Sequence, residues 1–262
     1  MGKKQKRPSL LSKITFKVIR FFGRLFYKKT DIVGMEKLAG RDIIIVANHA
    51  QLHGPIGELF MPENVYTWAN GQMVRCREVP KYAMEDFFLY KSKALRPIFM
   101  LASFGLAPLL PCVINNARVI PVYRDARIVS TLRNTIRHLE MGHNVLIFPE
   151  CHEKHNNIVN KFQENFVDVA KLYFRKTNRA LKFVPMYIAP ELGAAFVGEA
   201  TVFNSTEDIA NERIRISRYL SETITKIGCS LPEHTVVPFD NISRKFYLSS
   251  RETEKVNIEK MI

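Results

Sequence analysis

Short apolar runs rich in β-branched residues alternate along the chain with longer stretches in which apolar positions recur every three or four residues. The first pattern predicts buried strands, and the second predicts helices that bury one face. The predicted strands are residues 43–47, 65–69, 119–123, 144–148 and 182–188, with one or two short strands within 196–203. The predicted helices are residues 55–60, 127–141, 158–175 and 207–227. Strands separated by helical stretches indicate a layered α/β fold with a largely parallel central sheet flanked by helices.

Near the N-terminus, residues 10–28 show a clear helical period. The basic side chains are spaced three or four residues apart and share one face: Lys13, Lys17, Arg20, Arg24 and Lys28. The apolar side chains fall on the other face: Leu11, Ile14, Val18, Phe22 and Leu25. A basic amphipathic helix of this kind binds the interface of an anionic membrane. The same helix can also pack its apolar stripe on the folded domain, and the two roles are compatible.

A second segment that bears on membranes is the uncharged stretch 97–114. Its length alone would nominate a transmembrane helix. Pro108 and Pro111 argue against one uninterrupted span, because each removes a backbone donor and clashes with the preceding turn. We therefore expect a buried core helix followed by a strand. A hydrophobic segment that enters one leaflet of a bilayer remains the alternative.

The charge of the chain is concentrated at its N-terminus. The net charge is +14, and residues 1–30 hold ten Lys or Arg and no acid, whereas the rest of the chain holds 29 basic and 25 acidic side chains. A nucleic-acid-binding domain would spread this excess over a folded face, so no nucleic-acid partner is expected. The four cysteines are scattered, which suits a reducing compartment. The predicted organisation is a basic interface helix (1–30), an α/β domain (31–230) and a C-terminal tail (231–262).

Several predicted strands end in residues that can carry chemistry. The first ends in Asn48-His49, V-I-P-V-Y-R delivers Arg124, and V-L-I-F-P-E delivers Glu150. A further strand, F-V-P-M-Y-I, covers residues 183–188. Ligand sites in open α/β sheets form where strands end and loops begin. A neutral imidazole in such a place can take a proton from an attacking hydroxyl, and a guanidinium can bind a phosphate.

In this order, the N-H pair, the strand ending in arginine, the F-P-E triplet and the V-P-M-Y-I strand resemble the four motif blocks of the glycerolipid acyltransferase superfamily. That superfamily includes the 1-acylglycerol-3-phosphate acyltransferases, and the resemblance spans about residues 20 to 190. It implies transfer of a fatty acyl group from acyl-CoA or acyl-carrier protein to a hydroxyl of a lysophospholipid or glycerol-phosphate. It also implies a peripheral or monotopic protein on the cytoplasmic face of a membrane, with no cofactor and no metal.

The resemblance also suggests roles for individual residues. His49 would be the general base, Arg124 would hold the acceptor phosphate, and Glu150 would help to shape the acceptor pocket. The full set of expected substrate-binding residues is Asn48, Arg124, Phe148, Pro149, Glu150, Cys151 and His152. Two plainer interpretations stay open: His49 as a hydrogen-bonded histidine at a strand end, and Arg124 as the ion-pair partner of Asp125.

The chain departs from the family pattern after each of two blocks. The family has an aspartate five positions after the histidine to orient the imidazole, and this chain has Gly54. Glu58 follows position 54 by one turn of the predicted helix. From there its carboxylate would need a bridging water or His53 to reach His49. His53 and Glu58 also share the family spacing, so His53 is an alternative base. After F-P-E the family commonly runs Gly-Thr-Arg, where this chain has Cys-His-Glu, which leaves the acceptor open.

Two other functions remain as hypotheses. A metal-dependent hydrolase would use His49 and His53 as ligands, with His152 and His155 nearby, but the H-E-x-x-H signature is absent. A lipid-binding relative would keep the fold and the basic helix without catalysis. We favour the acyltransferase, with His49, His53 and Glu58 as the candidate catalytic residues.

Overall fold

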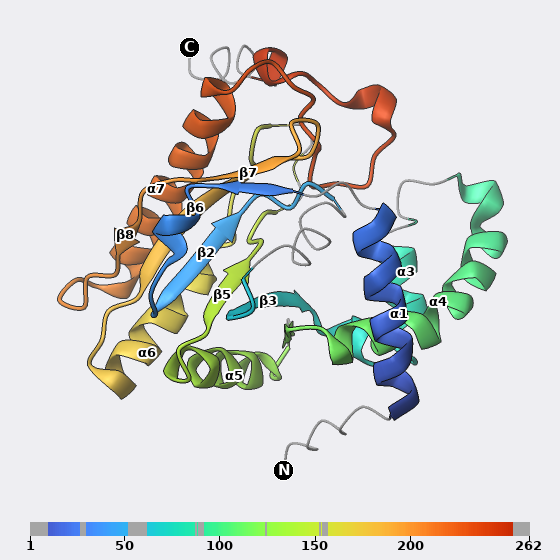
Figure 1. Cartoon of the computed structure of the whole chain (residues 1–262), viewed down its shortest axis with the longest axis horizontal. Helices are drawn as coiled ribbons and strands as arrows, with labels where there is room; N and C mark the ends of the chain where they lie inside the picture. Colours follow the sequence, from blue (N-terminus) through green and yellow to red (C-terminus); the bar gives the residue numbers. More distant parts are fainter. Residues whose placement is uncertain are drawn as a thin grey trace.

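The computed structural model describes residues 10–26, 30–51, 62–86, 88, 92–123, 125–151, 153 and 157–253. Its centre is an eight-stranded sheet in the order β1-β7-β6-β2-β5-β3-β4, with β8 paired to β6 (Figure 1). The strands are β1 (Asp31–Val33), β2 (Ile43–Ala47), β3 (Val65–Asn70), β4 (Val119–Val122), β5 (Asn144–Ile147), β6 (Lys182–Ala189), β7 (Ala194–Val197) and β8 (Thr201–Val202). The five strands from β6 to β4 run parallel, whereas β7 and β8 run antiparallel to β6. The predicted layered α/β fold with a largely parallel sheet is therefore confirmed.

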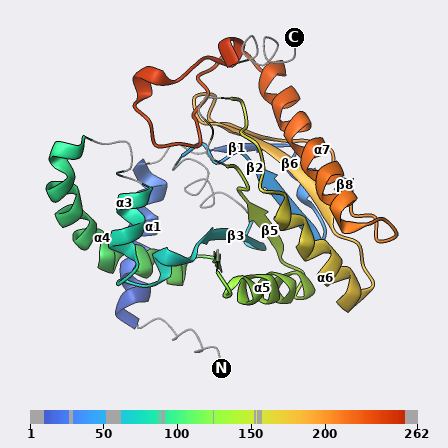
Figure 2. The same ribbon diagram turned by 180° about the vertical axis from the view of Figure 1, so that it is seen from behind.

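The helices form two groups around the sheet. On one face lie α5 (Ile128–Glu140), α6 (Asp168–Thr177) and α7 (Ile209–Ser230), seen in front of the sheet in Figure 2. Beyond the β4 edge, α1 (Leu10–Phe26), α3 (Val79–Glu85) and α4 (Arg96–Asn116) pack against one another. The division of the chain into interface helix, α/β domain and tail stays a prediction.

Strand β2 lies at the centre of the sheet, and all five of its residues are buried. Ile44 and Val46 join the core beneath α5, α6 and α7, whereas Ile43, Ile45 and Ala47 join the core on the opposite face. A strand buried on both faces is expected to be continuously apolar, which is the pattern that predicted it. Because β2 is flanked in parallel by β5 and β6, the residues that follow it emerge between two neighbouring strand ends.

The predicted helix at 158–175 is wrong in its first third. Residues 158–163 form no helix: Phe162 bridges to Glu150, Cys151 N–H donates to the Lys161 carbonyl at 2.8 Å, and Gln163 N–H donates to the Pro149 carbonyl at 2.8 Å. A short 3₁₀ turn (Glu164–Val167) follows, and α6 begins at Asp168. Ile158 and Phe162 are buried although this segment is not helical, so their four-residue spacing needs no helix. The predicted helix at 55–60 lies outside the described residues.

Helix α4 contradicts two expectations for the uncharged segment. It runs without interruption through Pro108 and Pro111, and Figure 1 shows that it bends along its length. It is also not a core helix, because Leu101 is 75% exposed and Phe104 is 59% exposed. By length and composition it could cross a membrane. The prolines are tolerated because a bend relieves their clash with the preceding turn.

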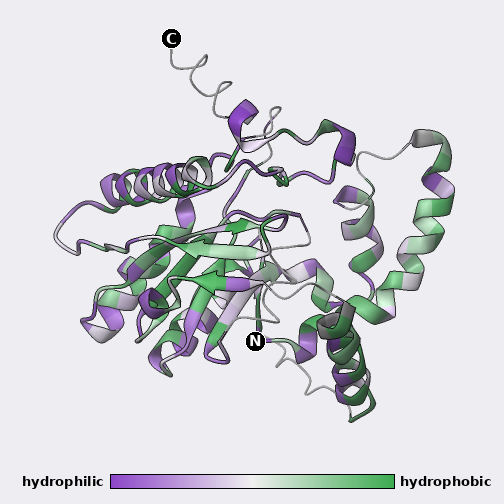
Figure 3. Ribbon diagram, turned by 45° about the horizontal axis from the view of Figure 1, so that its top comes forward, coloured by the Kyte–Doolittle hydropathy of each residue, from purple (hydrophilic) through white to green (hydrophobic). Residues whose placement is uncertain are grey.

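Helix α1 is attached to α4 by a small polar cluster. Asn116 Nδ2 donates to Ser12 Oγ at 2.7 Å, and Cys112 Sγ donates to the Ser12 carbonyl at 3.4 Å. The predicted apolar stripe of α1 is only partly covered, since Leu11, Ile14, Val18, Phe22 and Leu25 all remain exposed. Figure 3 shows α4 mostly in the hydrophobic colour as well. Together α1 and α4 present an apolar surface outside the core.

Two helical glycines give a matched test of the packing of α7. A Cβ at Gly228 would lie 2.6 Å from Ile158 Cγ2, whereas a Cβ at Gly105 in α4 would meet nothing within 4 Å. Gly228→Ala is expected to lower the free energy of unfolding by about 1–3 kcal/mol through overpacking. Gly105→Ala is expected to raise it by about 0.5–1 kcal/mol through helix propensity. Urea unfolding of both variants measures this, and equal effects of the two would contradict the packing.

Candidate active site

The loop that leaves β2 begins with an asparagine that joins two strands. Asn48 Nδ2 donates to the Ile188 carbonyl at 3.1 Å, and Asn48 Oδ1 accepts the Ile188 N–H at 2.6 Å. Asn48 is buried, and its amide continues the β2–β6 pairing one residue past the end of β2. The side chain therefore fixes the place from which His49 leaves the sheet. Contact of Asn48 with a substrate stays a prediction.

The chain then turns sharply through two left-handed residues. Ala50 has φ 46° and Gln51 has φ 51°, and neither is glycine. Such a backbone costs free energy at each residue and persists only where the surroundings impose it. Strain of this kind is often found at functional sites, and here it immediately follows the candidate base.

Glu150, which follows β5 in the chain, binds the backbone at the start of this turn. Its Oε1 accepts the backbone N–H of His49 at 2.5 Å, and its Oε2 accepts the backbone N–H of Asn160 at 2.8 Å. Both carboxylate oxygens are thus used by backbone groups of this chain. The glutamate of F-P-E shapes the site by fixing the backbone of His49, and direct contact with an acceptor stays a prediction.

The carboxyl group of Glu150 is buried and its ionisation is perturbed. Its pKa is raised to about 7, chiefly by burial and to a smaller extent by the nearby charges of Asp240 and Glu153. The two N–H donors act in the opposite direction, because they stabilise the carboxylate. Glu150 therefore changes its charge near neutral pH.

The imidazole of His49 lies against the edges of two phenylalanines. Its ring centre is 5.2 Å from that of Phe148 and 5.3 Å from that of Phe239, with interplanar angles of 70° and 80°. Phe148 comes from the F-P-E block, and Phe239 comes from the C-terminal segment. This apolar enclosure lowers the pKa of His49 to about 4, although the charge of Asp86 and the backbone of Gln51 favour the protonated ring. His49 is therefore neutral at pH 7.

One ring nitrogen of His49 lacks a partner. Nδ1 is buried and makes no hydrogen bond to any residue that the structure describes. In the serine protease triad the orienting carboxylate bonds this same nitrogen. His53, Gly54 and Glu58 lie outside the described residues, so the expected substitute acid stays a prediction.

The other predicted site residues fall into two groups. Pro149 is buried, and Cys151 accepts a bond from Asn160 Nδ2 at 3.1 Å through its carbonyl, so both brace the segment around Glu150. Arg124, His152 and His155 lie outside the described residues. The carboxylate of Asp125 is engaged by Arg127, whose Nε and Nη2 donate at 3.0 and 2.7 Å.

Sequence reasoning missed the residues that reach the site from the C-terminal segment. Gln51 Nε2 donates to the Asp240 carbonyl at 2.7 Å, and Tyr247 donates its hydroxyl proton to Gln51 Oε1 at 2.8 Å. Asn241 Nδ2 donates to Asp86 Oδ1 at 3.2 Å. These contacts join residues far apart in sequence, and no local pattern encodes them. An apolar V-V-P-F run at 236–239 within the polar tail was the one available signal.

Two other kinds of site bear on function. In the part of the chain that the structure describes, no group of three or more His, Cys, Asp or Glu side chains could hold a metal ion.

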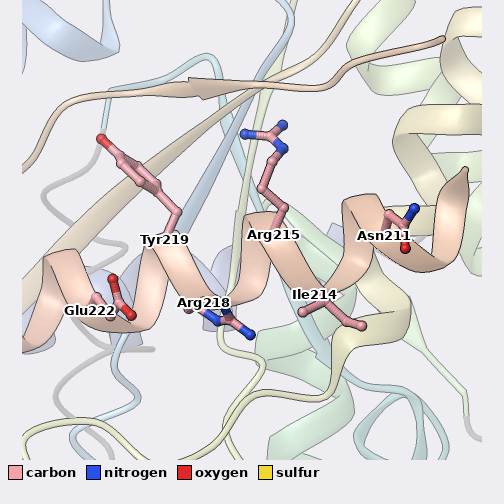
Figure 4. A pocket seen from close by; sticks show the side chains of 6 residues that line it. All are labelled: Asn211, Ile214, Arg215, Arg218, Tyr219 and Glu222. Atoms are coloured by element: carbon pink, nitrogen blue, oxygen red, sulfur yellow. The ribbon is translucent and has the colours of Figure 1, made fainter. Parts of the chain in front are cut away.

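A shallow depression of about 320 Å³ lies on α7, lined by Asn211, Ile214, Arg215, Arg218, Tyr219 and Glu222 (Figure 4). There the Arg215 guanidinium donates hydrogen bonds to the Thr201 hydroxyl and the Val202 carbonyl of β8. Strand β8 pairs with the amino end of β6. The depression therefore lies away from His49, which follows the carboxyl end of β2.

Comparison with known proteins identifies no family. No family model matches the chain, and no curated protein matches it. Among solved structures, the 1-acyl-sn-glycerophosphate (LPA) acyltransferase PlsC from Thermotoga maritima is similar over 80% of each chain, with a TM-score of 0.41 and 16% identity. Function therefore depends on what the residues of the site can do, and not on this likeness.

The raised pKa of Glu150 predicts how stability depends on pH. In the unfolded chain this carboxyl loses its proton near pH 4.5, and in the folded protein it does so near pH 7. The folded state therefore binds more protons between these values, and stability falls as the pH rises through them. Relative to Glu150→Gln, the wild type should lose up to about 3 kcal/mol of unfolding free energy between pH 4.5 and 7.

Urea unfolding of the wild type and of Glu150→Gln at pH 4.5, 5.5 and 7.5 measures this difference. Glu85→Gln is the control, because Glu85 is exposed at the end of α3 and its loss should give a difference that hardly changes with pH. A constant difference between wild type and Glu150→Gln across this range would contradict the buried, titrating carboxyl.

Proposed function

We propose that the protein transfers a fatty acyl group from an acyl thioester to a hydroxyl of a lysophospholipid or glycerol-phosphate at a membrane surface, with His49 as general base. The donor is acyl-CoA or acyl-carrier protein, and no metal or other cofactor takes part. The observation that carries the proposal is the setting of His49: a neutral imidazole at the exit of the central strand, enclosed by Phe148 and Phe239, on a turn fixed by Glu150.

The chemistry needs one proton to move twice. The imidazole takes the proton of the acceptor hydroxyl as its oxygen bonds to the thioester carbonyl carbon. The tetrahedral intermediate then collapses, the carbon–sulfur bond breaks, and the imidazolium returns the proton to the departing thiolate. The products are an ester and a free thiol. His49 is fully in its basic form at neutral pH, although its low pKa makes it a weak base.

The acceptor would be held by groups near the same sheet edge. Arg124 follows β4, and in this proposal its guanidinium binds the acceptor phosphate with two parallel hydrogen bonds. In the same proposal the F-P-E segment and His152 contact the acceptor, and Glu58 or His53 supplies the orienting or alternative basic group. These roles rest on the motif resemblance.

The surface of α1 and α4 supports a membrane location. Lys13 and Lys17 are exposed on α1, and apolar side chains of both helices are exposed as well. Basic side chains near an anionic bilayer each contribute about 1 kcal/mol, and apolar side chains gain by leaving water. We propose a peripheral or monotopic protein on the cytoplasmic face, with anionic lipids as partners of residues 10–28.

The unpartnered Nδ1 of His49 favours a second candidate function. Loss of an orienting carboxylate costs about 10⁴-fold in the serine protease template. A protein with this site could therefore bind lysophospholipid without transferring an acyl group. A metal-dependent hydrolase is supported by no contact among the described residues.

Acyl transfer by the full-length protein in detergent or vesicles tests the first proposal. Wild type should transfer labelled acyl groups from acyl-CoA or acyl-carrier protein to lysophospholipid or glycerol 3-phosphate. His49→Ala should lower turnover by about 10²–10⁴-fold, because the base is lost. His53→Ala tests the alternative base, whereas His138→Ala and the wild type with added chelator are controls whose turnover should not change.

Unchanged turnover in both His49→Ala and His53→Ala would contradict a histidine base. Lipid binding without transfer to any acceptor would favour the non-catalytic relative instead.

Vesicle flotation tests the membrane surface. Lys13→Glu/Lys17→Glu should weaken binding to vesicles containing phosphatidylglycerol by about tenfold or more, because two attractive charges become repulsive. Lys171→Glu/Arg175→Glu makes the same change, four residues apart, on the exposed side of α6, and should leave binding unchanged. Equal loss in both double variants would show that net charge alone determines binding.

A further inference from the structure

The C-terminal segment forms a loop with a fixed base. After α7, Val236 N–H donates to the Leu248 carbonyl at 2.9 Å and Ser250 N–H donates to the His234 carbonyl at 2.8 Å, so the chain returns beside itself. His234 is buried, and its Nε2 lies 2.8 Å from the Tyr187 hydroxyl at the end of β6. Its Nδ1 lies 2.8 Å from the Pro232 carbonyl, which can only accept, so Nδ1 carries the proton and Nε2 accepts from Tyr187.

Residues 237–247, between these anchors, reach the turn that follows His49. We call this segment the strap; it is part of the red chain at the upper right of Figure 1. The strap contacts the turn in three ways: Phe239 lies against the His49 ring, the Asp240 carbonyl accepts from Gln51 Nε2, and Tyr247 donates to Gln51 Oε1. Both ends of the Gln51 amide are therefore bound by the strap.

The turn needs this support because its backbone is strained. Ala50 and Gln51 are left-handed without being glycine. Glu150 restrains the turn only at its first residue, through the N–H of His49. The strap restrains the last residue, and a further bond from Asn241 to Asp86 ties the strap to the end of α3.

We propose that the strap positions His49 for proton transfer, with Gln51, Phe239 and Tyr247 as positioning residues. The expected effect on kcat rests on the proposed acyl transfer. The expected effect on the position of the His49 ring rests on the contacts alone. A base displaced by about 1 Å can lose about 10²-fold in rate, whereas substrate binding elsewhere is retained. The opposite role, a lid that blocks His49, would give faster turnover when the strap is loosened.

Tyr247→Phe removes one hydroxyl and keeps the ring, so the fold should survive, which thermal unfolding checks. In steady-state assays it should lower kcat by about 5- to 20-fold and change KM by less than threefold. Gln51→Ala should lower kcat by about 10²-fold. Tyr219→Phe is the matched control, because that hydroxyl donates to the Glu199 carbonyl at 3.0 Å on the distant α7 surface, and its kcat should not change.

A second readout does not depend on activity. The imidazole signals of His49, assigned with His49→Gln, should move in Tyr247→Phe as the ring is released from Phe239, and stay in place in Tyr219→Phe. If the His49 signals move in Tyr247→Phe but the protein transfers no acyl group, the positioning role of the strap is supported and the proposed function is refuted. Unmoved signals, or a kcat that stays the same or rises in Tyr247→Phe of an active enzyme, would overturn the strap.

Discussion

The carboxylate of Glu150 links the segments that follow β2 and β5, and the site depends on this link. One oxygen binds the backbone N–H of His49 at the exit of β2, and the other binds that of Asn160, in the segment that pairs with Pro149 and Cys151. Without this bridge the N–H of His49 would lose its acceptor, and the left-handed turn at Ala50 and Gln51 would lose a restraint. Burial makes the bridge costly when charged, and its hydrogen bonds offset part of that cost. The glutamate that the motif pattern would place at a substrate thus acts first on the backbone.

The strands were predictable because a sheet buried on both faces demands continuous apolar runs, as β2 shows. The proximity of His49 and Glu150 was also predictable, because the carboxyl ends of adjacent parallel strands meet at one edge. Local patterns failed where tertiary contacts bury the same spacing without a helix: Ile158 and Phe162 are buried although residues 158–163 are not helical. They failed completely for Phe239, whose contact with His49 spans most of the sequence. The roles of predicted residues were equally hidden, since only the structure shows Asn48 bound to Ile188.

The helices beyond β4 obey a different constraint from the core. A water-soluble helix buries its apolar side chains, yet α4 buries Ser103 and Pro111 and exposes Leu101 and Phe104. Exposed apolar area of this extent is unfavourable in water and favourable in contact with lipid. A site that handles fatty acyl chains gains from such a surface, because the chains need not cross water to reach it. The bend of α4 and the attachment of α1 through Ser12 fix the form of that surface.

The low pKa of His49 has opposite consequences for the two halves of acyl transfer. Taking a proton from a hydroxyl is disfavoured, because burial destabilises the imidazolium, whereas returning the proton to a thiolate is favoured for the same reason. A negative charge near the ring would reduce this imbalance, as the charge of Asp86 already does in part. In the proposed reaction, the phosphate of a bound acceptor would add such a charge. If acyl transfer is the reaction, the acceptor itself would then supply some of the electrostatic support that an aspartate gives in the family this sequence resembles. The base would strengthen only when the correct acceptor is bound.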